Sequence, residues 1–157
     1  MDDATILERL EALGHELPPS PKAVAAYVPV KIAGSVAHVA GQIAMVDGVP
    51  MHPGILGAGV TTEQGHAAAG FAALQALSAL QGALGGFGRL RGVSQVTVYL
   101  AATSDFVEHP QVANGASELL AAALGAPGQH ARAAVGMSSL PLGACVEVQV
   151  TAEVDPA

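Results

Sequence analysis

Arg132 and Glu147 are the residues that most suggest chemistry, because they are the only Arg and Glu in the nearly uncharged stretch from His130 to Thr151. Arginine presents a planar set of N–H donors that matches a carboxylate, and it stays charged when buried. A glutamate among valines loses solvation, which raises its pKa towards the range of a useful acid or base. Two interpretations stay open on spacing alone. The pair forms a structural salt bridge or faces solvent, or it binds a small anionic substrate.

The pattern around these two residues predicts the strands that must position them. Small or polar residues alternate with apolar ones over 131–137 and 145–151, and Ser138–Gly143 between them contains Pro and Gly. This pattern is typical of a β-hairpin. Arg132 and Glu147 would then be diagonal neighbours, roughly 5–8 Å apart, on a face whose small companions predict a cavity lining. A shift of one residue in the pairing register would place Arg132 and Glu147 on opposite faces. The opposite face is expected to form core: Ala133, Val135 and Met137.

The composition bounds the class of protein. The chain has 157 residues, of which 51% are hydrophobic and only 12% charged. So little charge predicts a homo-oligomer that buries apolar surface between subunits. The net charge of −7 and the total of six Lys and Arg argue against a nucleic-acid partner. The single Cys145 and the acidic N-terminus, with no apolar run expected to span a membrane, favour a cytoplasmic protein.

Two long helices and several strands are predicted around these residues. Helices are expected over 3–13, capped by Asp2 or Asp3; over 62–84, capped by Thr61 or Thr62; and over 107–124, with Pro110 in the first turn. Strands are expected over 27–32, 35–43 and 93–101, with a loop over 47–59. The order ββ–α–β–α–ββ, after an extra N-terminal helix, predicts a single α+β domain with antiparallel hairpins and the helices on one face of the sheet.

Other residues carry weaker signals. Tyr27 precedes the first strand, where its phenol could close a pocket, although packing is the commoner role. The six histidines are scattered without ligand spacing, so neither a metal nor a cofactor is expected. Cys145 has no activating neighbour in sequence and is expected to be a small buried side chain. The glycine-rich segment 82–88 ends a helix, whereas phosphate loops begin one.

The tail ARAAVGMSSLPLGACVEVQVTAEV resembles the signature of the RidA/YjgF family of reactive intermediate deaminases, approximately R-x-x-V-x-V-x-x-L-P-x-x-x-x-V-E-I-E-x-x-A. The segment beginning at Tyr27 and containing VAGQI is similar to another block of that family, and the resemblance extends over roughly 22–154. It implies a chorismate-mutase-like α+β fold, with residues 1–17 as an N-terminal extension. It also implies a homotrimeric barrel with its sites in clefts between subunits.

The resemblance also implies a reaction: hydrolysis of imines and enamines of the 2-aminoacrylate or 2-iminopropanoate type to 2-keto acids and ammonia. Arg132 would clamp the substrate carboxylate, and Glu147 would position or activate the attacking water. The remaining pocket residues would be Tyr27, Gly41, Asn114 and the backbone of Ala134.

The chain departs from the family pattern at one of these positions, Ala134, and at the neighbouring Ala40. The family often has Cys where this chain has Ala134 and Ser where it has Ala40, which leaves the substrate preference open. Two alternatives to the general deaminase are a pathway-specific deaminase of aminoacrylate or aminomuconate type, and a trimeric metabolite-binding or regulatory protein without turnover. Some relatives are described as ribonucleases or translation inhibitors, a function that the acidic balance disfavours here.

Overall fold

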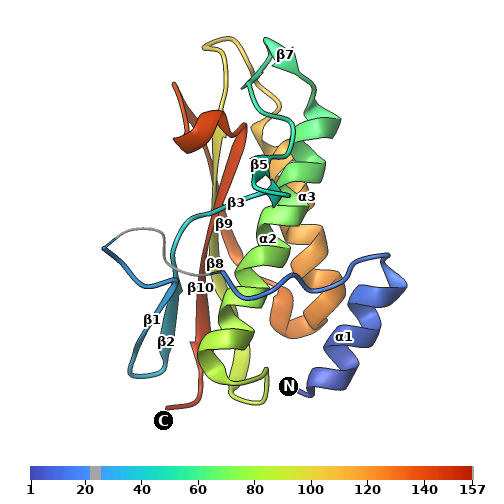
Figure 1. Cartoon of the computed structure of the whole chain (residues 1–157), viewed down its shortest axis with the longest axis vertical. Coiled ribbons are helices and arrows are strands. Elements are labelled where there is room, and N and C mark those ends of the chain that lie inside the picture. The colour runs from blue at the N-terminus through green and yellow to red at the C-terminus, as the bar shows by residue number, and fades with distance from the viewer. Residues whose placement is uncertain (22–25, 157) are drawn as a thin grey trace.

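The computed structural model describes residues 1–21 and 26–156. Its helices are α1 (Asp3–Ala12), α2 (Thr62–Leu84) and α3 (His109–Leu124). Its strands are β1 (Val30–Ala33), β2 (Val36–Val39), β3 (Gln42–Ile43), β4 (Met45–Val46), β5 (Val49–Pro50), β6 (Ile55–Leu56), β7 (Gly59–Val60), β8 (Leu90–Ala101), β9 (Ala131–Met137) and β10 (Val146–Val154). Two short 3-10 helices cover Ala126–Gly128 and Pro141–Gly143. In Figure 1 the helices lie on one side of the main sheet.

Within the described residues the main sheet has six strands in the order β1-β2-β10-β8-β9, with β3 also paired to β10. Strand β10 runs antiparallel to β2, β3 and β8, whereas β9 runs parallel to β8. Helix α3 connects β8 to β9, and a crossover of this length is what a parallel pair requires. The predicted α+β fold, with a mixed sheet and the long helices on one face, is confirmed.

The predicted hairpin of 131–137 with 145–151 is wrong, because β8 lies between β9 and β10. Alternation with a period of two shows which residues of a strand share a face, but it does not identify the neighbouring strand. The register pairs Arg132 with Val96 and Glu147 with Tyr99. Val96 and Tyr99 are an odd number of residues apart on β8, so Arg132 and Glu147 lie on opposite faces of the sheet.

The expected core face of β9 is also wrong. Val135 and Met137 are 39% and 38% exposed, on the face of the sheet away from the helices. Ala134 packs instead against the hydrophobic core. For β10 the prediction is confirmed, since its alternating valines at 146, 148 and 150 are all buried.

The first two strands are confirmed with shorter boundaries. The segment predicted as one strand over 35–43 divides in two, because β2 ends at Val39 and β3 begins at Gln42. The interruption lies at Ala40 and Gly41, and it brings Gly41 against the candidate site described below. Short strands β5, β6 and β7 lie within the segment expected to be a loop over 47–59.

Helix α2 is the central helix of the core. It begins with the capping box expected at its N-terminus, in which Thr61 and Gln64 each bond the other's backbone N–H. Among the described helices it alone has the length and the hydropathy, 1.3 over 18 residues, of a membrane span. The expectation that no apolar run reaches that length is therefore wrong. More than half of this window, 56%, is buried inside the protein, because α2 packs against α3 and the sheet.

The predicted N-terminal helix, α1, is confirmed. Its cap is Asp2, whose carboxylate accepts a hydrogen bond from the backbone N–H of Thr5 at 3.1 Å. Ile6 and Leu10 are buried, and Arg9 Nη1 donates to the carbonyl oxygen of Ala123 at the end of α3, 3.3 Å away. These contacts fix α1 on the C-terminal part of α3.

Helices α2 and α3 approach each other closely at a pair of glycines. A Cβ at Gly115 of α3 would lie 2.0 Å from the carbonyl oxygen of His66 in α2, and one at Gly70 of α2 would lie 3.3 Å from the carbonyl oxygen of Gly115. Backbone atoms cannot move aside as the end of a flexible side chain can. The distance between the helices therefore depends on the absence of a side chain at Gly115.

We predict that Gly115→Ala destabilises the fold, because the new methyl group forces α3 away from α2. The loss should be about 1–3 kcal/mol, although alanine itself is preferred in a helix by about 1 kcal/mol. Chemical denaturation at fixed protein concentration measures the free energy of unfolding. Gly88→Ala is the matched control, since a Cβ at Gly88 meets nothing within 4 Å. An equal effect of both substitutions would contradict this account.

Candidate active site

The first part of the candidate site surrounds Arg132, on the helix-facing side of β9. Its Nη1 donates to Asn114 Oδ1 at 2.8 Å and to Ser117 Oγ at 3.1 Å, and its Nη2 donates to the carbonyl oxygen of Pro110 at 3.4 Å. Residues 110, 114 and 117 have the i, i+4, i+7 spacing of one helical face, so α3 presents three acceptors in a row. We call Arg132, Asn114 and Ser117 the arginine cluster.

The arginine cluster leaves part of the guanidinium available. Arginine has five N–H donors, and the contacts with described residues involve both hydrogens of Nη1 and one of Nη2. The N–H of Nε and the second hydrogen of Nη2 have no partner among residues 1–21 and 26–156. Two such donors match the two oxygens of a carboxylate. Because the Arg132 side chain is exposed, a ligand can reach them.

The second part of the site surrounds Glu147, on the opposite face of the sheet. Its carboxylate is half-buried, and burial raises the pKa of Glu147 above its usual value. No ion pair or side-chain hydrogen bond from the described residues offsets this effect. An open hollow of about 380 Å³ adjoins the carboxylate, and we call it the glutamate hollow. Its lining residues are Gly41, Tyr99, Met137, Ser139, Leu140, Pro141, Glu147 and Gln149.

Gly41 lies directly against the Glu147 carboxylate. A Cβ at this position would be 1.8 Å from Glu147 Oε1, so any side chain here would push the carboxylate out of its present position. Gly41 also borders a second hollow, which contains Tyr27 and Leu142. Tyr27 and Glu147 are thus placed on either side of the same glycine. Tyr27 is 48% exposed, so its phenol is accessible there.

The structure therefore sorts the predicted site residues into two groups. Arg132 and Asn114 are in contact, and Ala134 is on the same face of β9. Tyr27, Gly41 and Glu147 form the other group.

The predicted proximity of Arg132 and Glu147 within one chain is wrong. The two residues are two strands apart in the sheet and three residues apart along β8. Strand spacing and rise put their Cα atoms on the order of 14 Å apart. Because they also face opposite sides of the sheet, they form neither a salt bridge nor a common pocket inside one chain.

Several polar residues of the site were not predicted from the sequence. Ser117 could have been found from its helical spacing to Asn114, once Asn114 was suspected. Tyr99 donates to Gln149 Oε1 at 3.1 Å beside Glu147, a contact that needs the pairing of β8 with β10 to be known. His130 contacts Ser117 and is considered below.

Two other features do not add to this site. Burial raises the pKa of the Cys145 thiol, which disfavours the nucleophilic thiolate. No cluster of three or more metal-ligating side chains occurs in the part of the chain that the structure describes.

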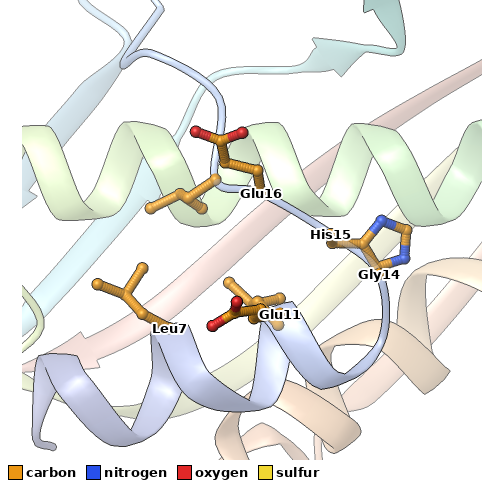
Figure 2. Close-up of a pocket in the computed structure, with 7 residues that line it drawn as sticks. Leu7, Glu11, Gly14, His15 and Glu16 are labelled. Atoms are coloured by element: carbon orange, nitrogen blue, oxygen red, sulfur yellow. The ribbon is translucent and has the colours of Figure 1, made fainter.

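A separate hollow lies between α1 and the segment after it (Figure 2). It contains none of the predicted site residues, and its rim carries Glu11 and Glu16. Two carboxylates would repel an anionic substrate, so this hollow does not suit the chemistry suggested by Arg132.

We predict that Glu147→Gln stabilises the protein increasingly as the pH rises. Burial raises the pKa of Glu147, so the folded wild type binds a proton more tightly than the unfolded chain. Its stability must then fall relative to the variant as the pH rises from about 4.3, the ordinary pKa of glutamate. Urea unfolding of both proteins between pH 4 and pH 8 measures the difference. A difference that stays constant over this range would show that burial does not perturb Glu147.

Comparisons with known proteins are consistent with this fold. The family model described as "YjgF/chorismate_mutase-like, putative endoribonuclease" matches residues 7–154. The chain is 38% identical over 151 residues to Protein TCP17 of Trypanosoma cruzi, covering 96% of this chain and 94% of that protein. It is 40% identical to the protein Atu1372 of Agrobacterium tumefaciens, whose crystal structure superimposes with a TM-score of 0.92 over 98% of this chain and 94% of that one.

A structure named RidA lies within the same set of similar folds. RidA from a Psychrobacter species is 26% identical and superimposes with a TM-score of 0.57, covering 86% of this chain and 94% of that one. The family model spans nearly the whole chain, and the resemblance seen in the sequence is confirmed. The chain belongs to the YjgF/chorismate-mutase-like family, which is the RidA/YjgF family indicated by its C-terminal signature.

Proposed function

We propose that this protein hydrolyses small imines and enamines that carry a carboxylate, of the 2-iminopropanoate or 2-aminoacrylate type, to 2-keto acids and ammonia. The observation that carries this proposal is the free edge of Arg132, whose guanidinium is held by α3 with two donors left for a carboxylate. A glutamate with a raised pKa and no partner among the described residues supplies the acid–base group. The resemblance of the C-terminal segment to the RidA/YjgF signature implies the same reaction class.

We further propose that each site is shared by two copies of the chain. A substrate with three or four carbon atoms cannot reach from Arg132 to Glu147 across roughly 14 Å and through the sheet. The arginine cluster of one subunit would therefore meet the glutamate hollow and Tyr27 of a neighbour. The face of the sheet opposite the long helices is suited to such an interface, because none of α1, α2 and α3 covers it (Figure 1) and it exposes Val135 and Met137. A homotrimer is the assembly that the family resemblance implies.

The proposed reaction needs few groups. Nε and Nη2 of Arg132 bind the substrate carboxylate, which fixes the imine carbon in the cleft. Glu147 accepts a proton from water, the water oxygen adds to the C=N carbon, and Glu147 passes that proton to the imine nitrogen to give a carbinolamine. Glu147 then takes the hydroxyl proton and gives it to the amino nitrogen, so that the C–N bond breaks, ammonia leaves and the C=O bond forms. An enamine is first protonated at its terminal carbon to give the imine. A carboxyl group with a raised pKa suits both directions of proton transfer.

The backbone of Ala134 contributes to the same cleft in this proposal, next to the carboxylate on Arg132. The Ala134 side chain is a small apolar methyl group, so the side chain adds no hydrogen bond to the substrate. Substrate preference within the class would then depend on the neighbouring subunit, through Tyr27 and the glutamate hollow. The pathway-specific deaminase differs from the general one only in this preference.

A ribonuclease function is the alternative that the family description names. An RNA substrate requires cationic side chains along its phosphates. The chain carries a net charge of −7 with only six Lys and Arg, and Arg91 is already paired with Asp155. These charges favour a small anionic substrate over RNA. A cytoplasmic location stays a prediction.

We predict that the wild-type protein accelerates the decay of 2-iminopropanoate generated in situ by an amino acid oxidase. Glu147→Gln should lower kcat by about 100-fold to 10,000-fold, the usual contribution of a general acid–base, and Arg132→Ala should mainly raise KM. Matched controls are Glu153→Gln, an exposed glutamate on the same face of β10, and Arg91→Ala, both expected to act like wild type. If the wild type does not accelerate the decay, the protein is a binding or regulatory protein. RNA cleavage that is lost in Glu147→Gln would favour the ribonuclease instead.

We also predict that two impaired variants restore activity, measured at low substrate concentration, when their subunits mix. Arg132→Ala and Glu147→Gln are co-expressed with different tags, and hetero-oligomers are isolated. In each isolated hetero-trimer one of the three sites combines an intact Arg132 with an intact Glu147 from the neighbour, so about a third of wild-type activity should return. Light scattering of the wild type should give a trimeric mass. Mixed oligomers without activity, or a monomeric mass, would rule out shared sites.

A further inference from the structure

We infer that Ser117 and His130 are positioning residues that aim the guanidinium of Arg132, an inference that rests on the proposed function of Arg132 as the carboxylate clamp. Ser117 Oγ lies 3.1 Å from Arg132 Nη1 and 2.9 Å from His130 Nε2. His130 Nδ1 lies 2.6 Å from the carbonyl oxygen of Gly128. The four groups form one continuous chain of hydrogen bonds from the backbone to the proposed clamp.

The direction of every bond in this chain follows from the donors available. Arginine has no acceptor, so Ser117 Oγ must accept from Arg132 Nη1. A carbonyl oxygen cannot donate, so His130 Nδ1 carries a proton and gives it to Gly128. In the neutral imidazole Nε2 is then the unprotonated nitrogen, and it accepts the one hydroxyl proton of Ser117. For the neutral side chain the geometry therefore specifies the Nδ1–H tautomer.

The far end of the chain is fixed to the scaffold. Gly128 belongs to the 3-10 turn Ala126–Gly128, and a Cβ there would lie 2.2 Å from the carbonyl oxygen of Leu120 in α3. The turn is thus pressed against the same helix that carries Ser117 and Asn114. Because both ends of the chain are tied to α3, His130 can hold the Ser117 hydroxyl proton in one direction.

This arrangement determines which donors of Arg132 remain for substrate. Asn114 and Ser117 together use both hydrogens of Nη1, so the guanidinium presents its Nε and Nη2 edge. Without Ser117, one hydrogen of Nη1 is released, and the guanidinium is held by Asn114 and by the longer, 3.4 Å bond to the carbonyl oxygen of Pro110. The edge that faces the substrate would then be less firmly fixed. The expected result is weaker binding of the carboxylate with little change in the chemistry at the imine carbon.

The test compares Ser117→Ala, Ser117→Thr and His130→Phe with wild type, using 2-iminopropanoate. Ser117→Ala and His130→Phe should raise KM about tenfold, as expected for a lost hydrogen bond to a charged group, with kcat changed less than about threefold. Ser117→Thr keeps the hydroxyl and should act like wild type. In an Arg132→Ala background Ser117→Ala should have no further effect, because the two residues act as a unit. Additive effects would overturn the positioning role.

A spectroscopic measurement separates this inference from the proposed function. In ¹⁵N-histidine-labelled wild type, His130, assigned with His130→Phe, should show the Nδ1–H tautomer, and Ser117→Ala should shift it towards the mixture found in solution. If the tautomer is as expected but imine hydrolysis is absent, the proposed function fails, and the same variants are tested for weaker binding of pyruvate. If His130 has the opposite tautomer in wild type, the hydrogen-bond chain is refuted whatever the enzyme does.

Discussion

The pairing of β8 with a different partner on each side is the constraint on which the rest of the structure depends. Along one edge β8 runs antiparallel to β10, and along the other it runs parallel to β9. The parallel pair requires a crossover, and α3 supplies it on the helical face of the sheet. That crossover places Pro110, Asn114 and Ser117 beside Arg132. The same pairing leaves Glu147 on the other face, so one chain holds two incomplete parts of the proposed site.

Small residues make the arginine cluster possible. Helix α3 can come close to α2 only because Gly115 has no side chain, and the turn after it can come close to α3 only because Gly128 has none. These approaches fix α3 between its neighbouring helix and the strand that carries Arg132. A chain with only 12% charged residues keeps the few charges that it has at defined positions. Arg132 is held by neutral acceptors of α3, which do not compete with an incoming carboxylate as an acidic partner would.

The elements of the fold could be predicted from the sequence, but one important pairing could not. Apolar periodicity and the capping box at Thr61 located α2, and Pro110 located the start of α3 to within two residues. Alternation over 145–151 identified the buried face of β10. The pattern of β9 fits either neighbour equally well, since alternation carries no information about pairing. The hairpin was wrongly predicted because β9 and β10 are joined by the shorter connection. The true partner of β9 is β8, and the chain runs from β8 to β9 through α3.

The candidate site was predictable residue by residue and not as an arrangement. Arg132 and Glu147 were recognisable as isolated charges, and the family signature added Tyr27, Gly41, Asn114 and Ala134. These residues lie on two different faces of the sheet because of the order of the strands, and no local sequence pattern shows that order. Ser117 is marked in the sequence only by its helical spacing to Asn114, and His130 carries no signal, because their link to Arg132 requires a helix and a turn to be placed beside β9.

The contact between Gly41 and Glu147 has a consequence for how this sequence can change through evolution. The missing side chain at one position and the carboxylate at the other occupy the same space, although the two positions are far apart along the chain. A change at position 41 alone costs the carboxylate its place. The Cδ and Cγ atoms of Glu147 lie 2.8 Å and 3.1 Å from that Cβ position, so even a shorter acid at 147 would be crowded by alanine at 41. Across many related sequences, positions 41 and 147 should therefore vary jointly. A relative with a larger residue at 41 should have lost the glutamate at 147 or should carry the acid at another position.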